Sequence, residues 1–292
     1  MSTRQGRIVR ALSGFYTVNC AGERIECRAR GVMRNQGVTP LVGDEVVVTL
    51  GEGLAAVEEI LPRRNALLRP PVANIDKLYL LSAFADPAPS PLLLDTQTAV
   101  CERAGITPVI VFNKCDEGDF SAIAAAYRTT GYEIFVISCK TGEGIDALRA
   151  SIPEGICAFT GNSGVGKSTL LNLLVPGLAL PTGEVSVKLG RGRHTTRHVE
   201  LYDMGGGRLL ADTPGFSSLS CDPVPKEEVA ALFPEFREHL GDCRFTTCTH
   251  TCEPGCGVLA ALAAGEIAPS RHASFIELYR QAAAAHPGDK RR

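Results

Sequence analysis

The segment that most constrains the fold of this chain is a glycine-rich phosphate loop. It fits the pattern G-x-x-x-x-G-K-[ST] and comprises Gly161, Asn162, Ser163, Gly164, Val165, Gly166, Lys167 and Ser168. The apolar run 156–160 before it predicts a buried strand, and residues 169–174 after it predict a helix. This order predicts an α/β domain whose backbone N–H groups surround a bound phosphate. A glycine-rich turn that matches by chance is the alternative, and the strand and helix context disfavours it.

Side chains of the loop and of a later motif have specific expected roles. Lys167 is expected to contact the β and γ phosphates of a nucleotide, and the Ser168 hydroxyl to bind Mg²⁺. Thr169, the next residue, belongs to the predicted nucleotide-binding set. Asp212 ends the apolar run 208–211 and begins the motif Asp-Thr-Pro-Gly. We expect its carboxylate to hold Mg²⁺ through water, and the N–H of Gly215 to contact the γ-phosphate.

Two guanine-recognition motifs come before the phosphate loop rather than after it. They follow the predicted strands 108–112 and 134–137, and comprise Asn113, Lys114, Cys115 and Asp116, and then Ser138, Cys139 and Lys140. A carboxylate can accept hydrogen bonds from both N1–H and the N2 amino group of guanine, so Asp116 is expected to select GTP over ATP. The rotated order predicts a circularly permuted GTPase domain, because the ends of a doubly wound sheet often lie close enough to be joined. It also makes the segment after Asp212 the exit of the domain, where we expect nucleotide-dependent change to act on the domain that follows.

The residue that positions the attacking water is less evident. Phe216 follows Gly215, where a glutamine could orient water, and a phenyl ring cannot. The catalytic candidate, beside Lys167, is His194 in the glycine- and arginine-rich run 190–197, which predicts a loop. A histidine that faces RNA or solvent is the alternative. Either Thr195 or Thr196 is expected to complete the Mg²⁺ shell, and slow hydrolysis raised by a partner is expected.

The C-terminal part of the chain contains a cluster of metal-binding residue types. Of eleven cysteines, four lie close together with one histidine among them, giving Cys243, Cys248, His250, Cys252 and Cys256. Three thiolates and one imidazole fill a tetrahedral Zn²⁺ site, and such a site is structural because no position stays open for chemistry. Five candidates are present for four positions. Disulfides are the alternative, and the sequence shows no signal peptide that would direct the chain to an oxidising compartment.

We predict three domains: residues 1–68, 69–220 and 221–292. The first contains short predicted strands at 7–12, 15–20, 24–29, 45–50 and 55–60, a pattern typical of a small β-barrel of the OB-fold type. The second alternates strands and helices as an α/β domain does. The third is predicted to be mainly helical, with a last helix at 270–285, and the basic, proline-containing segment 62–71 is predicted to be a stiff linker.

Charge distribution points to nucleic acid as a partner of the first domain. Residues 1–70 contain ten arginines, no lysine and seven acidic residues, a net charge of +3. Phe15 and Tyr16 are accompanied by Arg28, Arg30 and Arg34, a combination suited to RNA bases and phosphates. A solvated face with ordinary core aromatics is the alternative. No run of eighteen apolar residues occurs, so we expect no membrane span. We also expect a cytoplasmic protein, and a monomer because nothing in the sequence suggests an extended self-association surface.

Taken together, these motifs resemble the RsgA (YjeQ) family of circularly permuted ribosome-assembly GTPases over nearly the whole chain. Further matching pieces are Gly43-Asp44-x-Val46, Arg64-Asn65-x-Leu67-x-Arg69-Pro70 and Ala73-Asn74-x-Asp76. The resemblance implies a bacterial GTPase that binds the small (30S) ribosomal subunit and its rRNA late in maturation, with GTP hydrolysis promoting release. It also implies that Cys243, Cys248, His250 and Cys256 are the zinc ligands and that Cys252 is a bystander.

One departure from the family pattern bears on the Mg²⁺ shell. Arg197 stands where a third threonine is common in the family, which leaves the choice between Thr195 and Thr196 open, and we favour Thr196. Two other functions remain alternatives: a nucleotide-sensing RNA-binding module in which hydrolysis is incidental, and an RNA chaperone in which GTP is structural.

Overall fold

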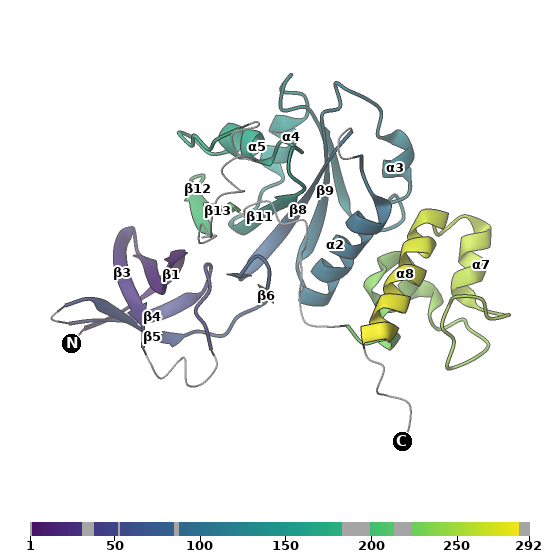
Figure 1. Cartoon of the computed structure of the whole chain (residues 1–292), viewed down its shortest axis with the longest axis horizontal. Helices are drawn as coiled ribbons and strands as arrows, with labels where there is room; N and C mark the ends of the chain where they lie inside the picture. The colour runs from purple at the N-terminus through teal and green to yellow at the C-terminus, as the bar shows by residue number, and fades with distance from the viewer. Residues whose placement is uncertain are drawn as a thin grey trace.

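The computed structural model describes residues 2–30, 38–51, 53–84, 88–182, 199–212 and 224–285. In Figure 1 the N-terminal strands, a central α/β domain and a C-terminal helical domain follow one another, with the central domain in between. None of the described helices combines the length and the apolar character needed to cross a bilayer.

The N-terminal domain is a closed five-stranded barrel, as predicted. Its strands are β1 (Ser2–Leu12), β2 (Phe15–Cys20), β3 (Glu23–Ala29), β4 (Glu45–Leu50) and β5 (Ala55–Ile60). They are ordered β1-β2-β3-β5-β4, and β4 returns to pair with β1. Strand β1 pairs with β4 through Ser2–Arg7 and with β2 through Arg7–Leu12, and a bulge interrupts the second pairing between Ile8 and Arg10. Val18, Val46 and Val57 are fully buried in its interior.

The central domain is a sheet with helices on both faces. Its parallel strands are β8 (Ile75–Ala83), β9 (Thr107–Asn113), β10 (Glu133–Ile137), β11 (Gly155–Gly161) and β13 (Arg208–Asp212), in the order β10-β9-β8-β11-β13, and β12 (Glu200–Asp203) is antiparallel to β13. The helices are α2 (Pro91–Ala104), α3 (Ser121–Ala125), α4 (Ile145–Ala150) and α5 (Lys167–Leu174). Alternate strand residues are buried on opposite faces: Leu80 packs with the cluster that includes Leu94 of α2, and Tyr79 with the cluster that includes Leu170 of α5.

The segment between these domains is packed against both of them. The short hairpin β6 (Ala66–Leu67) and β7 (Val72–Ala73) lies within it. Gly43 has φ +94°, and a Cβ atom there would lie 2.2 Å from the Ala73 carbonyl oxygen, so only glycine permits this approach. The Asn74 amide donates to the Gly43 carbonyl at 3.0 Å, and Arg63 donates to both oxygens of the fully buried Asp44 at 2.7 and 2.8 Å. The predicted linker is therefore a built junction rather than a spacer.

A second connection makes one continuous sheet of the barrel and the central domain. Strand β1 pairs with β12 in antiparallel register, with Arg10 opposite Glu200. The eleven strands from β10 to β4 therefore form a single hydrogen-bonded sheet, in which the barrel meets the edge of β12 at Glu200.

The C-terminal domain is helical, as predicted, although two of its helices are 3₁₀. It contains η1 (Lys226–Leu232), η2 (Pro234–His239), α7 (Gly257–Ala264) and α8 (Pro269–Ala285), the last matching the predicted 270–285. Phe233, Phe236 and Phe275 are fully buried and pack ring against ring at 5.1 to 5.7 Å between centroids.

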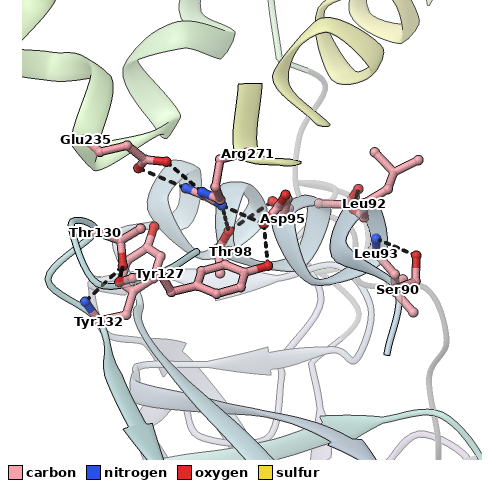
Figure 2. Close-up of polar contacts among 11 residues, drawn as sticks. Ser90, Leu92, Leu93, Asp95, Thr98, Tyr127, Thr130, Tyr132, Glu235 and Arg271 are labelled. Atoms are coloured by element: carbon pink, nitrogen blue, oxygen red, sulfur yellow. Dashed lines mark hydrogen bonds and ion pairs between the residues drawn. The ribbon is translucent and has the colours of Figure 1, made fainter. Parts of the chain in front are cut away.

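A buried arginine fixes this domain to helix α2. Figure 2 shows Arg271 of α8 between Glu235 of η2 and Asp95 of α2, and its side chain is 1% exposed. It donates to Glu235 at 2.6 and 3.0 Å and to Asp95 at 2.7 Å, and the Tyr127 hydroxyl donates to the same Asp95 oxygen at 2.7 Å. Because an unpaired buried charge is costly, these three charges hold the domains in one arrangement.

Candidate nucleotide-binding site and metal centre

The phosphate loop has the strand-loop-helix geometry that its sequence predicts. Strand β11 ends at Gly161 and α5 begins at Lys167, so the unpaired N–H groups of the first helical turn lie at the end of the loop. Gly166 is left-handed, with φ +93°, and a Cβ atom there would lie 2.3 Å from the Asn113 amide nitrogen. Because no side chain fits there, the loop backbone can approach the guanine-motif strand closely.

The loop lysine and the predicted magnesium aspartate are in contact. Lys167 Nζ lies 2.6 Å from Asp212 Oδ1, and the two side chains are 10% and 25% exposed. The two strands that carry them into place, β11 and β13, are direct neighbours. The ammonium and the carboxylate therefore neutralise each other, and each can exchange its partner for a phosphate or a cation.

Asn113 connects the phosphate loop to both guanine motifs. Its side chain is almost fully buried at the carboxyl end of β9. Its Nδ2 donates to the Val165 carbonyl at 2.7 Å, and its Oδ1 accepts the N–H of Cys139 at 3.1 Å. One amide group thus holds three loops together, which is the geometric reason for the amide at the head of this motif.

Asp116 is held as an acceptor by its neighbours. The Ser138 hydroxyl donates to Asp116 Oδ1 at 2.7 Å, while the same hydroxyl oxygen accepts the N–H groups of Lys140 and Thr141 at 3.2 and 3.1 Å. The Ser138 hydrogen bond and the nearby Lys140 ammonium, 3.4 Å from Oδ2, lower the pKa of Asp116. The group is a carboxylate at neutral pH and is acceptor-only, as recognition of two guanine donors requires.

The cysteines of the guanine motifs are protonated thiols. Burial raises the pKa of Cys139 to about 11 and also raises that of Cys115. Neither is a thiolate at neutral pH, so both serve as small residues here. Gly215, His194, Thr195 and Thr196 lie outside the described residues.

A charged row that the sequence did not predict runs from the barrel to this site. Arg10 stands opposite Glu200, and Glu200 stands opposite Asp212, so the three side chains share one face of the sheet. Tyr202, two residues from Glu200, has a raised pKa, first through burial and then through the charges of Glu200 and Asp212, which Arg10 opposes. Arg10, Glu200 and Asp212 are therefore all close enough to the Tyr202 hydroxyl to affect its pKa.

Four of the five predicted metal-binding residues form a compact cluster. The ligand atoms of Cys243, Cys248, His250 and Cys256 all lie within 4.8 Å of one another. Cys243 Sγ is 3.9 Å from Cys256 Sγ, and the His250 Nδ1 atom is 3.4 and 3.5 Å from those two sulfurs. A tetrahedral zinc with Zn–S bonds of about 2.3 Å needs sulfurs roughly 3.8 Å apart, so the cluster has the right size for this ion. Cys252 is exposed and outside the cluster.

The loop that carries these ligands is organised by a carboxylate. Glu253 accepts the N–H groups of Thr249, Thr251 and Cys252 at 2.8, 3.1 and 3.1 Å. Despite partial desolvation, these bonds lower the pKa of Glu253 to about 2. The sequence did not point to Glu253, because its role depends on a loop conformation rather than on a motif.

Comparison with known proteins gives the same assignment over the whole chain. The model of the RsgA GTPase family matches residues 60–222, and that of the RsgA N-terminal domain matches residues 5–56. A protein named small ribosomal subunit biogenesis GTPase RsgA from Geobacillus thermodenitrificans is 47% identical over 279 residues, covering 93% of this chain and 95% of the relative. Its namesake from Halalkalibacterium halodurans is 44% identical, covering 97% and 98%.

Two solved structures resemble this protein along nearly its full length. The crystal structure of YjeQ from Thermotoga maritima superposes with a TM-score of 0.81 at 34% identity and covers all of both chains. The structure of YloQ, described as a circularly permuted GTPase, gives 0.79 at 34% identity and covers 98% and 97%.

Proposed function

This chain belongs to the RsgA family of GTPases, and we propose that it hydrolyses GTP on the small ribosomal subunit during the late maturation of that subunit. The name of its relatives supports the small subunit as partner. The arrangement of Asn113, Asp116 and Ser138 around the phosphate loop supports guanine as the base. Hydrolysis then promotes release of this protein from the subunit. The protein is proposed to be cytoplasmic and to act as a monomer.

The nucleotide contacts follow from the geometry of the loops. Asp116 accepts N1–H and N2–H₂ of guanine, and the backbone of the loop Ser138–Cys139–Lys140 meets O6. Residues 161–169 surround the phosphates, with Lys167 leaving Asp212 for the β and γ phosphates. Lys114, Cys115 and Gly215 complete the proposed binding set.

Mg²⁺ is the proposed metal of this site. The Ser168 hydroxyl, the Asp212 carboxylate and Thr196 would hold it, and a bound Mg²⁺ would neutralise charge on the phosphates during transfer. The Asp212 carboxylate that now faces Lys167 supports this, since an ammonium in this place shows a site that accepts positive charge. His194 is the proposed group that orients water, because Phe216 cannot.

Zn²⁺ is the proposed ion of the C-terminal cluster, with a structural role. The four-ligand set of Cys243, Cys248, His250 and Cys256 fits the ion in size and donor type and leaves no open position.

The barrel is the proposed rRNA-binding domain, and its exposed aromatic residue supports this. Phe15 is 38% exposed, and the guanidinium of Arg28 lies over its ring at 4.4 Å. An open cavity of about 390 Å³ lies beside it, lined by Arg10, Leu12, Ser13, Phe15, Thr17 and Glu26. An exposed ring with a stacked arginine is a platform on which an unpaired base can stack. Tyr16, which the sequence also favoured for this role, is instead part of the barrel core at 8% exposure.

We expect purified small subunits to stimulate GTP turnover by this protein, and naked rRNA to stimulate it little. The reason is that a missing water-orienting glutamine leaves slow intrinsic hydrolysis, which a partner can raise by about 10³-fold or more in related chemistry. Turnover is measured alone, with rRNA and with subunits. In the same assay, His194→Ala should lose most of the stimulated rate while still binding GTP. Slow turnover with every partner would instead favour a nucleotide-sensing module in which hydrolysis is incidental.

We expect Phe15→Ala to weaken binding to small subunits by roughly tenfold, because loss of one stacked base costs about 1–3 kcal/mol. Binding is measured by co-sedimentation with the GTP-analogue form. The matched control is Leu54→Ala, which removes another exposed apolar barrel side chain away from the cavity. Equal affinities for the two variants would exclude Phe15 as an RNA contact.

A further inference from the structure

The barrel is joined to the strand that flanks the nucleotide site. Strand β12 lies between β1 of the barrel and β13, which ends at Asp212. Along one line across these strands stand Arg10, Glu200 and Asp212, with Lys167 against the last of them. The charges along this line are positive, negative, negative and positive.

The middle of this row is unfavourable by itself. Directly opposite residues on neighbouring antiparallel strands have Cβ atoms about 5 Å apart, and two like charges there repel. Glu200 and Asp212 are such a pair, and among the described residues Lys167 is the one cation in ion-pair contact with either of them. A bound phosphate competes with Asp212 for Lys167, because the ammonium that faces the carboxylate is also the one that reaches the β and γ phosphates. The cation that then remains beside the two carboxylates is Arg10.

Arg10 has the placement to fill this role. Its Nε is buried and has no hydrogen-bond partner among the described residues, so part of its donor capacity is unused. Its main chain is fixed on both sides, by Thr17 of β2 and by Glu200 of β12. Other arginines of the barrel form ion pairs with acidic residues of the barrel itself, as Arg7 does with Glu45 and Arg30 with Glu58.

Within the described part of the chain, the C-terminal domain has no comparable connection to β12. It is held on α2 through Arg271 and Asp95, with exposed pairs Arg103–Glu228 and Arg237–Glu102 beside them. Figure 1 accordingly shows the barrel on the β12 side of the central sheet and the C-terminal domain on the α2 side. Among the described contacts, the route from the nucleotide site to a flanking domain therefore leads to the barrel.

We propose that Arg10 is a positioning residue of the nucleotide site: by compensating Glu200 beside Asp212, it releases Lys167 for the phosphates and makes nucleotide affinity depend on the barrel. The proposal rests on the proposed nucleotide site. The role of Arg10 adds to that site a residue outside the central domain that regulates nucleotide affinity. A ligand that displaces Arg10 from Glu200 weakens nucleotide binding, and bound nucleotide opposes that ligand by the same factor, because linkage is reciprocal.

The test is a double-mutant cycle on the full-length protein, with fluorescent GDP as the probe and with and without Mg²⁺. Arg10→Gln should weaken GDP binding about three- to tenfold without Mg²⁺, because two uncompensated carboxylates retain Lys167. With Mg²⁺ the loss should shrink to about twofold or less, because a divalent cation near Asp212 replaces the missing charge. Arg10→Lys, which keeps the charge, should bind GDP like the parent protein.

Glu200→Gln gives the decisive arm of the cycle. Combined with Arg10→Gln it should restore GDP affinity to near the parent value, because the repulsion is gone. The matched control, Arg24→Gln, removes an exposed arginine from strand β3 of the same barrel and should change nothing. Arg10→Gln that behaves like Arg24→Gln overturns the proposal. So does a loss that is equal with and without Mg²⁺ and is not rescued by Glu200→Gln, because that pattern indicates local unfolding.

The outcomes separate this inference from the proposed function. Parent protein that fails to bind GDP contradicts the nucleotide site itself. Parent protein that binds GDP while Arg10→Gln binds it equally well contradicts only the role of Arg10, and leaves subunit-stimulated hydrolysis to its own assay.

Discussion

Replacement of Asp116 by asparagine is expected to reduce GTP affinity by about 10³-fold or more, because a site built to pair with substrate donors rejects a mismatched partner strongly. A carboxamide presents one acceptor and one donor group, so it cannot accept from both N1–H and N2–H₂ of guanine. Xanthine carries an acceptor in place of the N2 amino group and should now be preferred. Competition of GTP and xanthosine triphosphate against fluorescent GDP measures the exchange of preference.

A nearby carboxylate supplies the control for this experiment. Asp119→Asn changes an exposed residue whose bonds are to the Ser121 N–H and hydroxyl at the start of α3. It should leave GTP affinity unchanged. Asp116→Asn that still binds GTP at parental strength would mean that Ser138 and Lys140 hold this carboxylate for a structural purpose.

Replacement of Cys256 by serine is expected to abolish zinc binding and unfold the C-terminal domain. Structural zinc sites contribute about 10–16 kcal/mol of apparent binding free energy in small domains, and that free energy is folding free energy. The core around Phe233, Phe236 and Phe275 is small, so it should not hold without the ion. Zinc content per chain and amide exchange over α7 and α8 measure the two effects.

The chain provides its own matched control for zinc. Cys252→Ser removes an exposed thiol, two residues from His250, that lies outside the ligand cluster. It should retain one zinc per chain and parental amide protection. A zinc lost on Cys252→Ser, or kept on Cys256→Ser, would mean that the ligand set is wrong.

The features that were predicted correctly are those determined by residues close together in the sequence. The five barrel strands are present near the predicted places, because alternation of apolar residues between turn signals is a property of each segment, although β1 begins at Ser2, five residues before its predicted start. The phosphate loop is likewise encoded locally, since its glycines, Lys167 and the flanking apolar runs are contiguous. Family membership is confirmed by the comparisons, whereas the individual roles of His194 and Thr196 remain predictions.

Contacts between distant segments were not predictable in the same way. Arg271 has no motif around it, and its partners Asp95 and Glu235 belong to other elements of the fold. Phe15 and Tyr16 are adjacent in the sequence. Because side chains alternate between the two faces of a strand, the ring of Phe15 is exposed and that of Tyr16 is buried in the barrel. The pairing of Arg10 with Glu200 depends on which edge of the central sheet the barrel meets. No local pattern in the sequence indicates which edge this is.

The continuity of the sheet has a consequence for the order in which the chain is made. Strand β1 is synthesised well before β12, which emerges only after the rest of the parallel sheet apart from β13. A central domain cut free of its barrel would present β12 as an open edge, with unpaired N–H and C=O groups that invite pairing with another chain. A barrel that has folded beforehand would meet this edge at Glu200 as soon as β12 forms. We therefore expect the N-terminal domain to reduce edge-to-edge aggregation of its own chain during synthesis.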